Sequence, residues 1–301
     1  MLRNLRVPLW LDTLGKTGNR IASSPLAGMG ARPEKGIAVF GTESGPSSDA
    51  EEASIIGDVV ASASAVVPAE ETSRLREPLV AAFRDRVSNA LLKQADEQSL
   101  LALRAFCKLF ERWPELRRPD PNWGLVVAPR VPGRKRVIES IGKFREQGAW
   151  SISPHIIPHC TLHSLAGLLS QVLDLHGPNI GTGGKPGCEG EAFAVAGTWL
   201  AAERLPGLWL VLTGWDRESA TYRGSVCQAL VLGLKSAARE DISGRARLII
   251  SPTATSPHLP RVSLEALLAA MGNSGTATAW RLGVAGALTL HPATRVLETA
   301  A

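Results

Sequence analysis

Short apolar runs closed by glycine or proline alternate along this chain with amphipathic helical segments. This alternation constrains the fold more than any other feature. The run WGLVVA at 123–128 lies between Pro121 and Pro129, and LWLVLTGW at 208–215 follows Gly207. An unbroken apolar run of this length is typical of a strand buried on both faces, with helices above and below the sheet. The sequence therefore predicts an α/β fold.

Further elements are predicted around these two runs. Strands are expected at 225–234 and 246–251, and the tail at 279–290 is expected to form a strand or an irregular cap. Apolar residues at helical spacing predict helices at 78–93, 97–112, 134–147, 162–175, 189–204 and 263–272. Ser263 is the expected N-cap of the last helix, and Cys107 is expected to be a core thiol.

The basic residues gather at the start of the chain. Residues 1–35 hold six lysines and arginines against two acids, which accounts for +4 of the formal net charge of +5. The body therefore has no basic block of the kind that binds nucleic acid. We expect 1–35 to be a flexible basic N-terminal extension. A single domain is expected over 36–301, opening with a strand in GIAVFG at 36–41.

The remaining composition favours an ordinary globular protein of a reducing compartment. The four cysteines are scattered without a CxxC pair, so neither a zinc ribbon nor a disulfide framework is expected, and a cytoplasmic location fits best. No apolar run reaches the roughly 18 to 20 residues that span a bilayer, so no membrane span is predicted.

Three histidines are the first candidates for chemistry. His155, His159 and His163 are spaced four residues apart, as metal ligands on one helical face would be. Pro158 interrupts that face, and no acidic residue lies nearby to support the ligands. We therefore interpret them as loop and helix-start histidines and predict no metal.

The glycine-rich segment at 177–187 is the second candidate. A phosphate-binding loop requires serine or threonine after Gly-Lys, whereas Pro186 follows Lys185 here. The segment also fails the GxGxxG pattern, so we predict no nucleotide and no other cofactor.

Cys188 is the candidate nucleophile, because it lies between this glycine-rich turn and the helix expected at 189–204. A helix N-terminus lowers the pKa of a thiol, and its free N–H groups can hold a developing oxyanion. This chemistry suits an acyl-accepting cysteine. The alternative is a small buried residue in a tight turn.

Residues 153–193 resemble a stretch of the β-ketoacyl synthases. The matching pieces are Ser153-Pro154, Pro158, Ala166-Gly167 and Gly177-Pro178-Asn179. The strands expected at 123–128, 208–215 and 225–234 resemble those that flank the stretch. The resemblance implies the thiolase-like fold of the N-terminal half of a β-ketoacyl synthase, with a mixed sheet and helices on both faces.

The sequence also departs from active synthases. Their nucleophile lies nine residues after the glycine of Gly-Pro-Asn, and this count from Gly177 ends on Pro186. Their His-Gly-Thr and Asn-Gly-His motifs do not occur. The pattern is similar to the chain-length-factor-like proteins of aryl-polyene and polyketide clusters. The resemblance implies a dimer with an active β-ketoacyl synthase subunit and contact with an acyl carrier protein.

Three functions follow as hypotheses. The first is a non-elongating partner in fatty-acid or polyketide biosynthesis, which presents an apolar helix such as 162–175 to an active synthase. The second is a cysteine acyltransferase that uses Cys188, with His155, His159 or His163 as base. The third is an interaction or regulatory module that inherited the fold.

Overall fold

The computed structural model describes residues 54–86, 88–153, 159–202, 204–217, 224–237, 246–251, 258–272, 276–283 and 286–292. The chain from Ser54 onward forms one compact unit. The extension expected over 1–35 and the strand expected at 36–41 lie outside the described residues, so the domain boundary at 36 stays a prediction.

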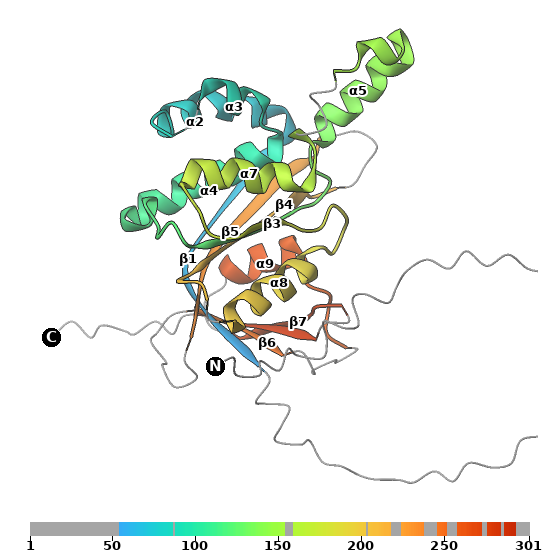
Figure 1. Ribbon diagram of the computed structural model, residues 1–301. Coiled ribbons are helices and arrows are strands. Elements are labelled where there is room, and N and C mark those ends of the chain that lie inside the picture. Colours follow the sequence, from blue (N-terminus) through green and yellow to red (C-terminus); the bar gives the residue numbers. More distant parts are fainter. Residues whose placement is uncertain are drawn as a thin grey trace, which may run out of the picture. The chain divides into compact units, whose positions relative to one another are not determined.

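The described residues form an α/β fold around a mixed sheet of eight strands, in the order β3-β2-β4-β5-β1-β6-β8-β7 (Figure 1). β2 is parallel to β3 and β4, and every other neighbouring pair is antiparallel. The strands are β1 (Ile55–Pro68), β2 (Gly124–Pro129), β3 (Asn179–Gly181), β4 (Leu208–Trp215), β5 (Val226–Ser236), β6 (Ala246–Ser251), β7 (Thr278–Arg281) and β8 (Ala287–His291). The α-helices are α2 (Arg76–Ala82), α3 (Asn89–Gln94), α4 (Glu97–Arg112), α5 (Arg134–Gln147), α7 (Leu162–Leu173), α8 (Glu189–Ala201) and α9 (Leu264–Gly272).

Helices cover both faces of the sheet, which is why the apolar runs are uninterrupted. Figure 1 shows α4 and α7 on one face and α8 and α9 on the other. In β2, Leu125 and Val127 join the core under α4 and α7, whereas Val126 and Ala128 join the core under α8 and α9. Every residue of β2 and β4 is buried, which confirms both predicted strands.

The longest strand, β1, was not predicted from the sequence. It pairs with β5 along most of its length and with β6 at its start. A register shift at Val60 inserts one extra residue, so Val59 faces the α8 core while Ala61 and Ala65 face the α4 core. Because alanines line its inner face under α4, β1 has no run of large apolar residues.

The structure confirms most of the predicted helices and corrects one. The single helix predicted at 78–93 is wrong, because α2 ends at Ala82 and α3 begins at Asn89. The Ser88 hydroxyl accepts a hydrogen bond from the Leu91 N–H (3.3 Å) and so caps a new helix. Ser263 caps α9 as predicted, by accepting from the Ala266 N–H (3.2 Å). No helix in the described part of the chain is long and apolar enough to cross a membrane.

An aromatic cluster anchors α4 to the sheet. The ring of Trp209 on β4 lies 5.2 Å from Phe106 in an edge-on arrangement and 4.9 Å from Trp123. Glycine is required beside these rings, since a β-carbon at Gly207 would lie 2.3 Å from the Trp123 ring and one at Gly233 would lie 2.9 Å from the Trp209 ring. The cluster therefore accounts for one glycine just before β4 and one within β5.

Truncating Phe106 tests this anchor. We expect Phe106→Ala to lower the free energy of unfolding by about 3–5 kcal/mol, because the side chain is fully buried and leaves a cavity. The matched control is Phe144→Ala, whose side chain is 53% exposed and whose loss should change stability by about 0.5 kcal/mol at most. Urea unfolding measures both, and equal losses would contradict this role for Phe106.

Candidate functional site

Cys188 lies where the sequence predicted it, at the N-cap of α8, but its thiol is fully buried. It belongs to the core that contains Val126, Ala128 and Phe193. The glycine-rich turn seals it, since a β-carbon at Gly183 would lie 2.8 Å from the Cys188 Sγ. The position matches an acyl-accepting cysteine, whereas the packing matches a small buried residue in a tight turn.

The electrostatic surroundings keep this thiol protonated. Burial, with a smaller contribution from the adjacent Glu189 carboxylate, raises the pKa of Cys188 to about 12, although Arg130 opposes the shift. Only the thiolate attacks an acyl group efficiently, and almost none is present at neutral pH. The geometry therefore does not favour acyl transfer by Cys188.

No histidine among the described residues hydrogen-bonds to Cys188 or is among the groups that shift its pKa. His155 lies outside them, His163 is exposed on the first turn of α7, and His159 is half-buried just before it. The charged groups that act on Cys188 are Glu189, Arg130 and Glu191. In the described part of the chain, no three His, Cys, Asp or Glu side chains are grouped to hold a metal ion.

An ion cluster at the carboxyl end of β2 joins the buried side chains of Arg130 and Glu189 to the partly exposed Glu265. The Arg130 Nη2 lies 2.7 Å from the Glu265 Oε1 and 3.4 Å from the Glu189 Oε1. The same Glu189 oxygen accepts a hydrogen bond from the Leu264 N–H (3.2 Å) at the start of α9. The cluster ties the N-termini of α8 and α9 to the sheet, where carboxylates are favourable.

Gln98 fixes the strained turn that follows β2. Its side-chain amide donates to the carbonyls of Arg130 (2.6 Å) and Val131 (2.9 Å), and its Oε1 accepts from the Thr213 hydroxyl (2.6 Å). Val131 has a φ of 55°, which a β-branched residue rarely adopts. The three bonds hold this backbone conformation in place.

Two carboxylates at the start of α4 hold the start of α5. Asp96 accepts from the Ser99 N–H (2.8 Å) in its own helix and from the Gly133 N–H (2.7 Å). Glu97 accepts from the Lys135 N–H (3.0 Å). Burial, with a smaller contribution from the Asp96 charge, raises the pKa of Glu97 to about 7.

These polar groups bond mainly to one another and to nearby backbone, and they lie at the carboxyl ends of β2 and β4, where α/β proteins place their ligands. No motif in the sequence identified Arg130, Gln98, Glu97 or Glu189 beforehand. The only signal was three acidic or amide residues at the start of a predicted helix. The arrangement can position three helices, but it offers no exposed nucleophile.

An exposed apolar face on α5 is the second candidate. Val137, Ile141 and Phe144 are 38%, 48% and 53% exposed and lie on one side of the helix, and Trp150 beyond it is fully exposed. Val137, Ile141 and Phe144 border a hollow of about 440 Å³. Its lining is Val137, Ser140, Ile141, Phe144, Ile152, Cys160 and Thr161. Their helical spacing was visible in the sequence, but their exposure was not.

The helix predicted to meet a partner, α7, does not have a free apolar face. Its apolar residues are buried in the core of the chain itself. They are Leu165, Ala166, Leu168, Leu169, Val172 and Leu173. This corrects the prediction that 162–175 forms an interface, because the sheet already covers those side chains.

The fold is shared with solved proteins, although no family model and no curated protein matches the sequence. One similar structure is a ketosynthase (ApeO) in complex with its chain length factor (ApeC) from Xenorhabdus doucetiae. Its TM-score is 0.51 at 14% identity, and the match covers 78% of this chain and 99% of that chain. The chain therefore has the thiolase-like fold of ketosynthases and chain length factors.

Two further structures match less closely. A β-ketoacyl synthase from Burkholderia phymatum has a TM-score of 0.46 at 13% identity, covering 72% of this chain and 69% of that one. A type II polyketide synthase acyl-carrier protein in complex with its ketosynthase has a TM-score of 0.45 at 12% identity. That match covers 60% of this chain and 62% of the other, which is less than two thirds of its length.

The raised pKa of Glu97 predicts how stability depends on pH. A carboxyl group with a higher pKa in the folded state than its usual 4.5 stabilises the fold fully below pH 4.5 and loses this effect as pH rises to about 7. We expect the unfolding free energy of the natural chain to fall by up to about 3 kcal/mol relative to Glu97→Gln across this window. Urea unfolding at several pH values measures it.

The control for this titration is Glu146→Gln, because Glu146 is exposed on α5. The difference in unfolding free energy between this variant and the natural chain should not change with pH. If the difference for Glu97→Gln does not change with pH either, the assignment of the buried carboxyl is wrong.

Proposed function

We propose that this chain is a synthase-like, non-elongating partner subunit of an active β-ketoacyl synthase in fatty-acid or polyketide biosynthesis, resembling a chain length factor. The observation that carries this proposal is Cys188, which occupies the nucleophile region of a thiolase-like fold as a sealed, protonated thiol. A subunit without an available nucleophile contributes by shape rather than by covalent chemistry.

The partner surface in this proposal extends from α5 to β3. Cys160, which borders the α5 hollow, packs against Gly133 at the start of α5, and the next residues lead into Leu162, which packs against Gly181. Gly181 ends β3, one of the two edge strands of the sheet, where Ile180 is 38% exposed. An edge strand offers unpaired backbone groups to a second chain. Apolar and backbone contacts are thus available on one continuous surface.

The α5 hollow supplies the proposed influence on chain length. Its walls are mostly apolar side chains, and it opens on the surface assigned to the partner. Once a synthase covers it, the hollow becomes one wall of an apolar space that can hold a growing acyl chain. In this scheme the acyl carrier protein delivers that chain to the synthase subunit, and this chain requires no cofactor.

Complex formation tests the partner surface. We expect the chain to co-purify with a full-length β-ketoacyl synthase encoded beside it, and Phe144→Asp to weaken the complex by at least about tenfold, because it puts a charge into an apolar interface. Analytical ultracentrifugation of the purified pair measures the affinity.

The matched control for the complex is Val66→Asp. Val66 is also 53% exposed, but it lies on β1, where it pairs with β5 and does not belong to the proposed partner surface. Val66→Asp should bind the synthase as the natural chain does. A chain that stays monomeric with every such synthase would refute the proposal. An equal loss of affinity in Phe144→Asp and Val66→Asp would refute the assignment of α5 to the partner surface.

An elongation assay separates shape from covalent catalysis. With the reconstituted pair, we expect Cys188→Ala to elongate as the natural chain does, because the thiol takes no acyl group. Ile141→Trp should shift the products to shorter chains by filling the hollow. Mass spectrometry of products and of Cys188 is the measurement.

The two alternatives predict different results in this assay. A cysteine acyltransferase requires Cys188, so Cys188→Ala would abolish turnover and an acyl adduct would be found on that residue. An interaction or regulatory module would leave product length unchanged in Ile141→Trp and in the absence of the chain. Either outcome would overturn the role proposed above.

A further inference from the structure

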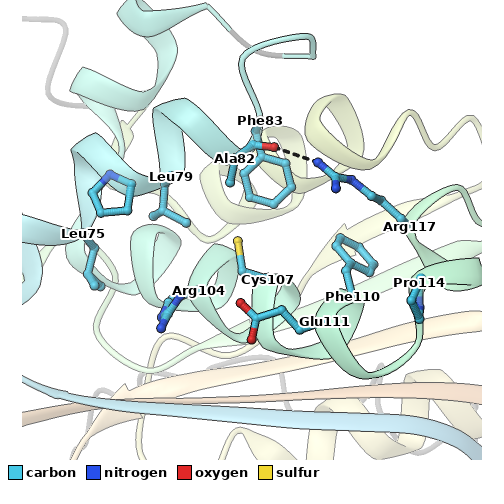
Figure 2. Close-up of a pocket in the computed structure, with 11 residues that line it drawn as sticks. Leu75, Leu79, Ala82, Phe83, Arg104, Cys107, Phe110, Glu111, Pro114 and Arg117 are labelled. Carbon is cyan, nitrogen blue, oxygen red and sulfur yellow. Dashed lines mark hydrogen bonds between the residues drawn. The ribbon is translucent and has the colours of Figure 1, made fainter.

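A second hollow, of about 590 Å³, lies between α2 and α4. Figure 2 shows Leu79, Ala82 and Phe83 on one wall, with Cys107 and Phe110 on the other. Its lining is Leu75, Pro78, Leu79, Ala82, Phe83, Arg104, Cys107, Phe110, Glu111, Pro114 and Arg117. None of these residues borders the α5 hollow or belongs to the ion cluster, so the proposed function leaves this space unused.

The break between α2 and α3 shapes this hollow. Because the chain leaves helical geometry after Ala82, Phe83 turns into the core instead of continuing along a helix. At the other end, Pro114 follows the last turn of α4. Leu79, Phe83 and Phe110 are buried members of the core, so the inner wall is fixed by packing and is not a loose surface groove.

Charges are confined to the rim of the hollow. Arg117 is already engaged, since its Nη2 donates to the Ala82 carbonyl (3.1 Å), as the dashed line in Figure 2 shows. Arg104 is half-buried and makes no hydrogen bond or ion pair with any of the described residues. Its charge acts on the Cys107 thiol, which places it close to the apolar interior. Glu111 is the only acid of the rim, and it is exposed.

The Cys107 thiol is unsuited to a covalent role. The sequence predicted a core thiol, whereas Cys107 is half-buried, and Figure 2 shows its sulfur directed from α4 toward α2. Burial raises its pKa to about 11, so it is protonated at neutral pH. It lines the wall as a small apolar group and can report on whether the hollow is filled.

We propose that the hollow between α2 and α4 binds a fatty carboxylate, with its hydrocarbon tail against Leu79, Phe83 and Phe110 and its carboxylate paired with Arg104. The volume lies within the roughly 300 to 1,000 Å³ of small-molecule sites, and such sites combine apolar walls with few polar groups. A rim with two arginines and one exposed glutamate favours an anionic head group over a cationic one. None of its lining residues belongs to the partner surface proposed on α5 and β3.

Calorimetric titration of the full chain with hexanoate, octanoate and decanoate, below their micellar concentrations, tests the site. Affinity should rise roughly fourfold per added methylene, because each buries about the same apolar area. Arg104→Gln should weaken decanoate binding about tenfold and leave 1-decanol binding unchanged. The exposed neighbour Lys108→Gln is the charge control and should retain the natural affinity.

A pair of tryptophan variants tests the location of the site. Cys107→Trp should abolish decanoate binding by filling the hollow, whereas Cys160→Trp, in the α5 hollow, should not. If Cys107→Trp fails to fold, protection of the natural chain replaces it: decanoate should slow alkylation of Cys107 and not of Cys160.

Three results would overturn the proposal. They are no binding of decanoate by the natural chain, affinity that does not change with chain length, and loss of binding in Cys160→Trp alone. The last would move the ligand to the α5 hollow. Because synthase binding is measured separately, failure here leaves the proposed partner role intact, and failure of that role leaves this site testable.

Discussion

The guanidinium of Arg130, held between the carboxylates of Glu189 and Glu265, is the interaction on which the arrangement of helices depends. It joins the end of β2 to the first turns of α8 and α9 at distances of 3.4 and 2.7 Å. The Arg130 and Glu189 side chains are buried, and removing one partner of a buried pair costs about 3–5 kcal/mol.

That geometry has a chemical consequence. A nucleophilic cysteine in this fold needs an open turn, free backbone N–H groups and a nearby base. Here Gly183 packs onto the thiol, and the Glu189 carboxylate, which follows Cys188 directly, raises its pKa. The residues that stabilise the helix N-termini thus also keep this thiol buried and protonated. Accessible apolar surface is found on α5 and between α2 and α4.

The sequence predicted those parts of the fold in which local pattern and burial agree. The strands β2 and β4 were found because both faces are buried, so their apolar runs are unbroken. The strand β1 was missed because its inner residues are alanines and a bulge at Val60 interrupts its period of two. The predicted helix at 78–93 failed because Ser88 caps a new helix in its middle.

The sequence predicted the position of Cys188 but not its burial. The place of Cys188 at a helix N-terminus follows from glycines and a helical pattern, which are local features. Its burial depends on Gly183 and on the core under α8, and these contacts join residues that only the fold brings together. The burial of the apolar residues of α7 and α5 was likewise not predictable from local pattern. Both helices have an apolar side, and only the sheet decides that α7 is covered while α5 is exposed.

The exposed helix is nevertheless fixed by the core. Asp96 and Glu97 begin the buried helix α4, and their carboxylates accept the N–H groups of Gly133 and Lys135 at the start of α5. Gln98 holds the strained turn just before it. The direction in which α5 leaves the sheet is therefore set by side chains of α4, whose own position is set by Phe106 and Trp209. A surface that acts by shape needs such support, because its effect depends on where its side chains are held.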